Sequence, residues 1–396
     1  MNMICIKKSI LWLFVAVFGI MIVGVNYGFM RAKDNEAAAK FENRTITKFP
    51  SVSIRKKEFY TEFEKWYSDR MYKRQEAIFL WRKGKYAIGV VEPKNIIIGE
   101  NDWLLSKRKF VKYIDDEKKT SKLKEMQMFC EQNGAKFLIM FAPYKDLACK
   151  RYYPYAFRKK IVDHFQISDV AVKSLQANGV DYVDTCSVIM KAMEHDDPEH
   201  TLYVKDDHHW SYFGAMIAAD LLLNKMDDMI GIEYDHVLTD GTILKGTKEC
   251  SRWKKLGLGN EKQRSIGDVP WHEKYTKNLE IIYSHNGKVI HPKKPIANSY
   301  LWEPMLKGEG IIINRDKKNG RTMLMLTDSY GTYMMPYLSQ YFKSVVCTHY
   351  LRKDEKKQYT NMRYLLERYK PDIVVLFSMN YLYRGVDSTF KNLVYE

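Results

Sequence analysis

Residues 205–215, KDDHHWSYFGA, place two carboxylates beside two imidazoles, which are groups that transfer protons. If the segment is extended, side chains two positions apart share a face, so Asp207 can orient His209. The spacing also allows two other pairings, Asp206 with His209 and Asp206 with His208. An imidazole oriented by a carboxylate is the base that a nucleophilic serine requires.

A serine in a suitable setting follows a short apolar run later in the chain. Ser329 stands in LTDSYG, directly after TMLML. We expect the strand to turn there into a helix, which places the serine at a helix N-terminus. Backbone N–H groups at such a position favour developing negative charge. The structural alternative is that Asp328 or Ser329 only caps the helix.

Metal binding is another use of the same cluster, because Asp and His are good zinc ligands and His195 and His200 lie nearby in sequence. The cluster lacks the spacing of His-Glu-x-x-His and a third ligand with a clear role. A solvated structural loop is the remaining alternative. We favour acid–base chemistry and expect no metal and no other cofactor.

The elements that must position these residues begin near residue 116, where short apolar runs alternate with amphipathic helices. This alternation is typical of an α/β protein with a doubly wound parallel sheet covered on both faces. In such sheets functional groups gather at the carboxyl ends of the strands. The predicted strands are residues 136–142, 180–185, 322–329, 343–350 and 371–380.

Other segments complete the predicted organisation. Residues 116–396 form the α/β domain, with an insertion of β-character at about 225–320 that contains SHNGKVIH, an Asn-Gly hairpin signal. Residues 57–115 begin with an aromatic amphipathic helix and form a helical region that packs on the core. Residues 31–56 are a polar stalk.

Residues 9–30 carry no charge. At about 1.5 Å per residue they extend about 33 Å, which matches a hydrocarbon core of roughly 30 Å. We predict an uncleaved transmembrane anchor within residues 1–30, with a cleaved signal peptide as the alternative. Lys7 and Lys8 favour a cytoplasmic N-terminus, so the rest of the chain is expected outside the cytoplasm, on the membrane.

Composition narrows the classes of partner. The chain of 396 residues has 64 Lys and Arg against 48 Asp and Glu, a net charge of +16. This charge favours an anionic partner such as an acidic glycan or an anionic lipid surface. The alternative is that the charge only reflects a soluble, lysine-rich protein surface. The basic residues are not interleaved with aromatics on one segment, so we expect no nucleic acid. Six cysteines without a Cys-x-x-Cys pair exclude zinc ribbons and thioredoxin-like redox sites.

The two motifs together resemble those of the DHHW proteins, which are similar to the alginate O-acetyltransferase-like branch of the SGNH hydrolase superfamily. In the resemblance, Asp-x-His-Trp is anchored by Trp210 and selects Asp207 and His209, leaving Asp206 and His208 as second choices. The Gly-Asp-Ser motif of the family corresponds to Ser329 as nucleophile. Thr327 stands where glycine is usual.

Further segments share the resemblance, which runs along most of residues 42–383. They are ENRTITKFP, FEKWYSDRMYKRQ, NDWLL, FAPYKDLACKRYYP and KKLGLG. Asn380, Tyr330 and Lys145 are candidates for contact with the oxyanion or the substrate, and a capping or hairpin role is the alternative for Asn380.

The resemblance implies an SGNH-hydrolase-like fold and a membrane-anchored O-acyltransferase. Such an enzyme transfers an acyl group, usually acetyl, through an acyl-serine to a hydroxyl of an extracytoplasmic polysaccharide. A separate multi-spanning membrane acyltransferase would supply the acyl group. The alternatives are a carbohydrate esterase with the same triad and a catalytically inactive glycan-binding or assembly protein.

Overall fold

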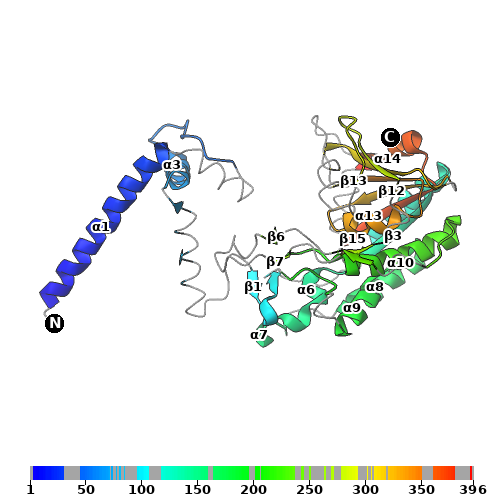
Figure 1. The fold of residues 1–396 in the computed structure, drawn as a ribbon, viewed down its shortest axis with the longest axis horizontal. Coiled ribbons are helices and arrows are strands. Elements are labelled where there is room, and N and C mark those ends of the chain that lie inside the picture. Colours follow the sequence, from blue (N-terminus) through cyan, green and yellow to red (C-terminus); the bar gives the residue numbers. More distant parts are fainter. Residues whose placement is uncertain are drawn as a thin grey trace. The chain divides into compact units, whose positions relative to one another are not determined.

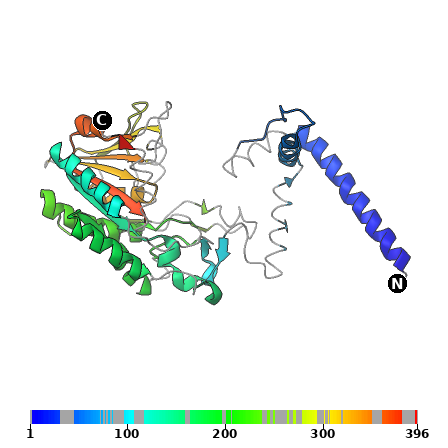
Figure 2. The ribbon, with the colours of Figure 1, turned by 180° about the vertical axis from the view of Figure 1, so that it is seen from behind.

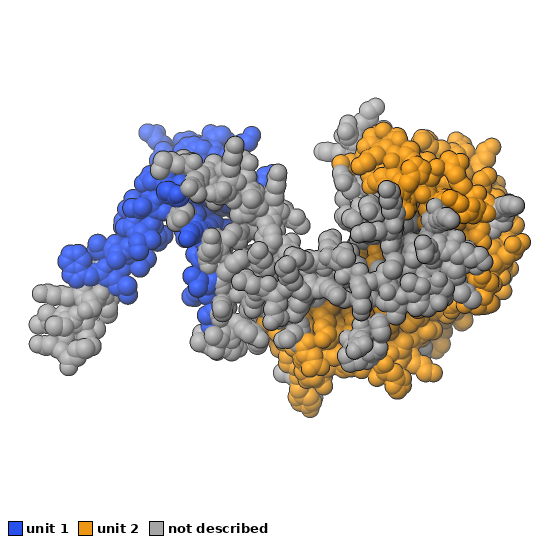
Figure 3. All heavy atoms as spheres, in the orientation of Figure 1, with its two compact units in different colours: residues 1–93, 251–262 blue, residues 94–250, 263–396 orange. Residues whose placement is uncertain are grey.

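The structure is a computed structural model with two compact units, residues 1–93 with 251–262, and residues 94–250 with 263–396 (Figure 3). The described residues are 3–30, 45–71, 73–74, 77, 80–81, 84, 96–106, 117–158, 164–195, 201–205, 207–236, 242–244, 249–250, 263–264, 269–271, 278–292, 301, 305, 307–317, 320–349, 360–379 and 393–394. Asp206, His200 and Asn380, and the KKLGLG segment, lie outside the described residues.

The first unit contains helices α1 (Met3–Met30) and α3 (Lys57–Asp69). The aromatic stripe of α3 packs on the preceding segment, with the Phe49 ring 4.9 Å from that of Trp66. Asp69 accepts a hydrogen bond from the amide of Thr47 at 2.8 Å. In the described part of the chain, no helix has both the length and the hydropathy needed to cross a membrane, so the anchor remains a prediction.

The second unit is built on one eight-stranded sheet in the order β10-β9-β11-β13-β12-β15-β3-β4 (Figure 1). Its strands are β3 (Lys136–Ala142), β4 (Tyr182–Asp184), β9 (Leu279–Tyr283), β10 (Val289–Ile290), β11 (Glu309–Asn314), β12 (Thr322–Thr327), β13 (Ser344–His349) and β15 (Ile373–Met379). Strands β13 to β4 pair in parallel, as the sequence predicts.

The sheet as a whole is mixed, which corrects the expectation of a parallel sheet. The predicted insertion supplies β9, β10 and β11, and these strands pair antiparallel onto the edge of β13. The predicted Asn-Gly hairpin is confirmed, because Val289 of β10 pairs with Ile282 of β9. Gly287 in its turn has φ +67°, a left-handed conformation that glycine adopts without steric cost. The insertion therefore extends the sheet and covers its open edge.

Helices cover both faces of the sheet, because alternate residues of the strands are buried on opposite sides (Figures 1 and 2). Leu138 and Met140 face α10 (Tyr212–Ile230), whereas Phe137 and Ile139 face the opposite set of helices. That set comprises α5 (Glu117–Gln132), α8 (His164–Ala177) and α14 (Met362–Tyr369). The continuous apolar runs of the sequence are thus explained by burial on two faces.

The remaining described elements are short. The helices are α6 (Lys145–Ala148), α7 (Tyr155–Arg158), α9 (Cys186–Ala192) and α13 (Met335–Leu338), with 3-10 turns at Glu100–Asp102, Lys150–Tyr152, Met193–His195 and, labelled η5, Gly331–Met334. The paired strands are β1 (Ile96–Ile98) with β2 (Leu104–Ser106), β5 (Thr242–Leu244) with β8 (Val269–Trp271), β6 (Glu249–Cys250) with β7 (Gln263–Arg264), and β14 (Thr360–Asn361) with β16 (Leu393–Val394).

The strand order brings the candidate residues to one edge of the sheet. Strand β15 lies between β3 and β12, and all three run in the same direction. The turns that follow β3 and β12 therefore leave the same edge, at residues 143–145 and 328–330. The loop that carries His209 reaches this edge from the start of α10.

Helix α10 is fixed at its first turn. The Ser211 hydroxyl accepts hydrogen bonds from the amides of Phe213 and Gly214 at 3.1 and 3.3 Å, as the predicted N-cap requires. A Cβ atom on Gly214 would overlap the carbonyl oxygen of Leu202. Only glycine allows the helix to approach the loop before it this closely.

We expect Gly214→Ala to lower the free energy of unfolding by about 1–3 kcal/mol, because the added methyl group forces the helix away from the loop. Chemical denaturation of the full chain measures this change. Gly19→Ala is the matched control, since a Cβ atom there meets no atom within 4 Å. Equal stability of the two variants would contradict the close packing at Gly214.

Candidate active site

The loop of residues 201–211 doubles back on itself and is tied to the end of β3. Tyr203 and Trp210 form an antiparallel bridge, and the amide of Ser211 donates to the carbonyl of Leu202 at 2.9 Å. The Tyr203 hydroxyl donates to the carbonyl of Pro143 at 2.7 Å. Tyr203 and Trp210 are completely buried, so the loop is anchored in the core on both sides of the acidic and histidine residues.

A chain of hydrogen bonds links this loop to the turn after β12. The Nε2 atom of His209 lies 2.7 Å from the Oγ of Ser329, and its Nδ1 lies 2.9 Å from the Oδ2 of Asp207. The His209 side chain is nearly buried, with 9% of it exposed. The structure thus brings together the three residues that the sequence selected, although 120 positions separate His209 from Ser329.

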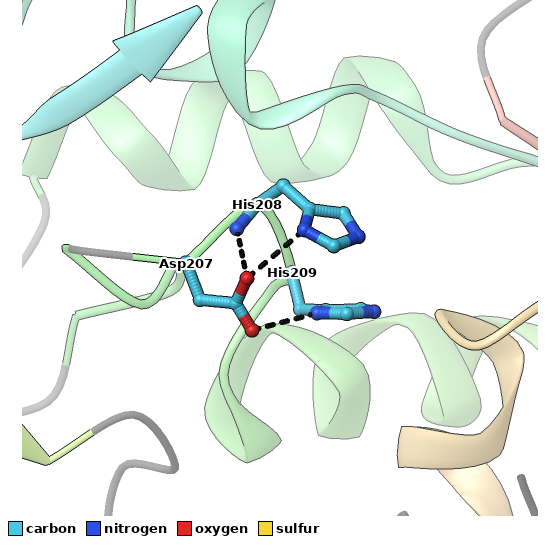
Figure 4. A group of neighbouring side chains, drawn as sticks. All are labelled: Asp207, His208 and His209. Atoms are coloured by element: carbon cyan, nitrogen blue, oxygen red, sulfur yellow. Dashed lines mark hydrogen bonds and ion pairs between the residues drawn. The ribbon is translucent and has the colours of Figure 1, made fainter. Parts of the chain in front are cut away.

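His208 shares the same carboxylate, which the sequence did not predict (Figure 4). Its amide and its Nδ1 lie 2.7 and 2.9 Å from the Oδ1 of Asp207. The two imidazole rings stand with their centroids 3.9 Å apart, and the His208 side chain is 58% exposed. Each oxygen of the Asp207 carboxylate therefore faces its own imidazole.

These contacts determine the charge of Asp207. Burial raises the pKa of its carboxyl group, but hydrogen bonds from His208 and His209 lower it by more, so the pKa lies well below the usual range for aspartate. Asp207 is therefore an anion at neutral pH. An anion at the Nδ1 atom stabilises the imidazolium form of His209.

Tyr330 connects the turn that carries Ser329 to the histidine loop (residues 201–211) through hydrogen bonds. Its carbonyl accepts from the indole Nε1 of Trp210 at 2.9 Å, its hydroxyl donates to the carbonyl of His208, and its amide donates to the Oδ1 of Asp328 at 2.9 Å. Burial raises the pKa of the Tyr330 phenol well above its usual value, so it remains a proton donor. These polar groups hold protein atoms in place, which favours a positioning role over contact with substrate.

The Ser329 turn accommodates the unusual Thr327. The Thr327 side chain is completely buried at the end of β12, and its hydroxyl donates to the carbonyl of Asp328 at 3.1 Å. A Cβ atom on Gly331 would overlap that hydroxyl. The absence of a side chain at Gly331 thus leaves room for the Thr327 side chain, which stands where glycine is usual in the Gly-Asp-Ser motif.

The helix expected after Ser329 is present as two short pieces. Ser329 precedes η5 and then α13, each of four residues. The Thr332 hydroxyl donates to the Ser329 carbonyl at 2.7 Å and stabilises this turn. Any contribution of a helix dipole is therefore confined to a short segment, and hydrogen bonding dominates at Ser329.

Lys145 lies inside the protein, at the end of β3. Its side chain is nearly fully buried, and its ammonium donates to the backbone carbonyls of Leu104, Lys205 and Asp207 at 2.9, 2.6 and 2.8 Å. The ammonium therefore contacts the loop that carries His209. The resemblance identified this residue, within FAPYKDLACKRYYP, but no local signal in the sequence indicated that it binds carbonyls of that loop.

Tyr333 is a neighbour that sequence reasoning missed. Its ring stacks on that of His209 with centroids 5.2 Å apart, and it lies in η5, four positions after Ser329. The side chain is buried. Its spacing from Ser329 was visible in the sequence, but only the fold shows that it contacts the imidazole.

The same cluster has some features of a metal site. Ligand atoms of Asp207, His208 and His209 lie within 4.8 Å of one another. Both ring nitrogens of His209, however, already face Asp207 and Ser329 at hydrogen-bond distance. A metal on these residues would compete with that chain of hydrogen bonds, so the geometry favours proton transfer.

The low pKa of Asp207 predicts a pH dependence of stability. We expect Asp207→Asn to lower the free energy of unfolding by about 1–3 kcal/mol at pH 7, because the hydrogen-bonded anion is lost. The folded pKa lies below the unfolded value of about 3.9, so the stabilisation is present above that pH and is lost as the pH falls further.

Denaturation of both proteins between pH 3 and pH 7 measures this difference. Asp228→Asn, at an exposed position on α10, is the control. A difference between wild type and Asp207→Asn that stayed constant down to pH 3 would contradict the assignment.

Comparison with known proteins bears on the same region. Residues 96–236 match a family profile described as the SGNH hydrolase-like domain of acetyltransferase AlgX. This segment contains β3, the 201–211 loop and all of α10. A search of the curated proteins found no match.

Solved structures share the fold over most of the chain. Bacillus cereus PatB1 with a sulfonyl adduct has a TM-score of 0.53 and 14% identity, over 74% of this chain and 96% of that chain. A DHHW family protein from Eubacterium siraeum also has a TM-score of 0.53 and 14% identity, over 77% of this chain and 98% of that chain. At these identities the likeness concerns the fold. The profile confirms the resemblance to the alginate O-acetyltransferase-like, SGNH hydrolase-like family that the sequence predicts, and the fold is shared with a DHHW family protein.

Proposed function

We propose that the second unit transfers an acyl group, acetyl in the simplest case, to a hydroxyl of a polysaccharide through an acyl-serine at Ser329. The observation that carries this proposal is the chain of hydrogen bonds from the Ser329 hydroxyl through His209 to Asp207, at 2.7 and 2.9 Å. A serine, a buried imidazole and an anionic carboxylate in this order form a nucleophile, a base and its orienting group.

In the first half-reaction, the Ser329 Oγ attacks the carbonyl carbon of the acyl donor, and its proton moves to the Nε2 of His209. The tetrahedral intermediate collapses, and the leaving group departs with that proton. The Asp207 carboxylate accepts the Nδ1–H of His209, stabilises the imidazolium and keeps the ring in one orientation. The product is an ester on Ser329.

In the second half-reaction, a sugar hydroxyl gives its proton to His209 and attacks the acyl-serine. The ester passes to the sugar, and the proton returns to the Ser329 Oγ. Because the amide of Tyr330 donates to Asp328, we assign the oxyanion to the Ser329 amide and to the Asn380 side chain, which follows β15 in sequence.

The choice of transfer over other acyl chemistry rests on the relatives. The profile that matches residues 96–236 is described for an acetyltransferase, AlgX, and this segment contains Asp207 and His209, which supports acetyl transfer. The net charge of +16 suits an acidic polysaccharide as acceptor. A carbohydrate esterase would form the same acyl-serine and differ only in using water as the acceptor.

We also propose that α1 holds the protein at a membrane with the second unit outside the cytoplasm, where a multi-spanning membrane acyltransferase supplies the acyl group. Large apolar side chains between Trp12 and Val23 on α1 are exposed, which supports attachment to lipid. A surface polysaccharide lies on that side of the membrane.

We expect Ser329→Ala to lower the rate of acyl transfer by about 10³-fold or more, because no acyl-enzyme can form. The assay mixes the protein with an activated acetyl ester and oligosaccharides and weighs the products by mass spectrometry. Ser344→Ala is the matched control and should remain active. Ser344 begins β13 and pairs with the first residue of β12, whereas Ser329 follows the last residue of β12.

The same assay separates the alternatives. Acetylated oligosaccharide that disappears in Ser329→Ala is the expected result. Free acetate as the sole product would indicate an esterase. A wild-type protein that makes neither product and resists labelling by a fluorophosphonate would indicate a catalytically inactive glycan-binding or assembly protein.

We expect the full chain to sediment with membranes and to stay there after a high-salt wash, because apolar contacts resist salt. A chain that begins at residue 32 should appear in the supernatant. Recovery of the full chain in the supernatant would show that residues 1–30 do not attach the protein.

A further inference from the structure

The buried ammonium of Lys145 joins three segments beside the candidate active site. It belongs to α6, directly after β3, and it donates to Leu104 of the β1–β2 hairpin and to Lys205 and Asp207 of the histidine loop. An ammonium has three N–H donors, so three carbonyls use all of them. The Nζ atom also lies 5.0 Å from the ring centroid of the buried Trp103.

The acceptors show that the contact is built into the backbone. The Lys205 carbonyl also accepts the amide of Leu104 at 2.9 Å, so the hairpin and the loop meet at this point. The neighbouring Asp146 accepts from the amide and the hydroxyl of Ser106 at 2.7 and 2.5 Å. Two consecutive residues of α6 therefore fix the hairpin, and Lys145 extends the connection to Asp207.

Burying an ammonium is costly unless hydrogen bonds replace its water. Here the replacement comes from carbonyls of the segment whose side chains form the proposed triad. The Asp207 residue presents its carbonyl to the ammonium and its carboxylate to His208 and His209. By holding the backbone carbonyl of Asp207, the ammonium thus fixes the position from which the Asp207 side chain extends.

We propose that Lys145 is a positioning residue that holds the backbone of Asp207, and through it the imidazole of His209, in the geometry that activates Ser329; this inference rests on the proposed function. Lys145 acts through the backbone carbonyls to which its ammonium donates. Arginine cannot replace it, because a planar guanidinium cannot direct three donors at carbonyls that converge on one nitrogen atom.

The test measures how fast phenylmethanesulfonyl fluoride reacts with Ser329, a reaction that needs neither acyl donor nor polysaccharide. The Ser329 Oγ forms a bond to sulfur, fluoride leaves, and the proton passes to His209. In the full chain, Lys145→Ala should lower the maximal labelling rate by about 10- to 100-fold, the scale expected for a small displacement of reacting groups. Lys136→Ala, at the exposed start of the same strand β3, is the matched control.

Rescue by an added amine distinguishes positioning from a general loss of stability. n-Propylammonium has the atoms that Lys145→Ala removes, so it should restore labelling in a saturable manner. It should leave the wild type, Lys136→Ala and Asp207→Asn unchanged. If Lys145→Ala does not fold alone, refolding with n-propylammonium should recover a protein that labels at Ser329.

The outcomes also separate this inference from the function on which it rests. Wild type labelled at Ser329 and Lys145→Ala labelled at the same rate would overturn the inference alone. A slow Lys145→Ala that no concentration of n-propylammonium accelerates or refolds would do the same. A wild-type protein that is not labelled at Ser329 would overturn the proposed function together with the inference.

Discussion

The imidazole of His209 must reach two partners at once, and the rest of the second unit serves this requirement. Its two ring nitrogens lie 2.9 Å from Asp207 and 2.7 Å from Ser329, which come from segments far apart in sequence. Hydrogen bonds tolerate only small changes in these distances. The buried Trp210 and Tyr330 meet this constraint by joining the two segments beside the imidazole.

The histidine loop is polarised between its two sides. Towards the interior it presents carbonyl oxygens, which bind the ammonium of Lys145. Towards the serine it presents the Asp207 carboxylate, which binds two imidazoles. Hydrogen bonds thus hold the loop from both sides, through its carbonyl oxygens on one side and the Asp207 carboxylate on the other, without depending on regular secondary structure.

The local sequence was sufficient to predict where the parallel strands lie along the chain. KFLIMFA predicts a strand at 136–142, and β3 has those bounds, because both of its faces are buried and every residue after Lys136 is apolar. The order of the strands depends on how segments far apart in sequence pair with one another. The antiparallel pairing of β11 with β13 depends on the same long-range contacts. No local pattern contains that information.

The site shows the same division. The pairing of Asp207 with His209 was one of three that the spacing allowed, and the resemblance to DHHW proteins selected it. His208 was considered only as a partner of Asp206, but its backbone amide and its ring both turn to Asp207, because the segment bends at this point. Lys145 stood out as a residue, whereas its partners come from two other segments that only the tertiary fold brings near.

The central position of β15 has a consequence for biosynthesis. It is the last strand of the eight-stranded sheet along the chain, yet it separates β3 from β12. During translation, the half-sheet of β3 and β4 and the half-sheet of β12 and β13 emerge from the ribosome as separate pieces with unpaired edges. They become one sheet only when residue 379 has been made, so the nascent chain needs protection from other exposed strands until β15 has emerged.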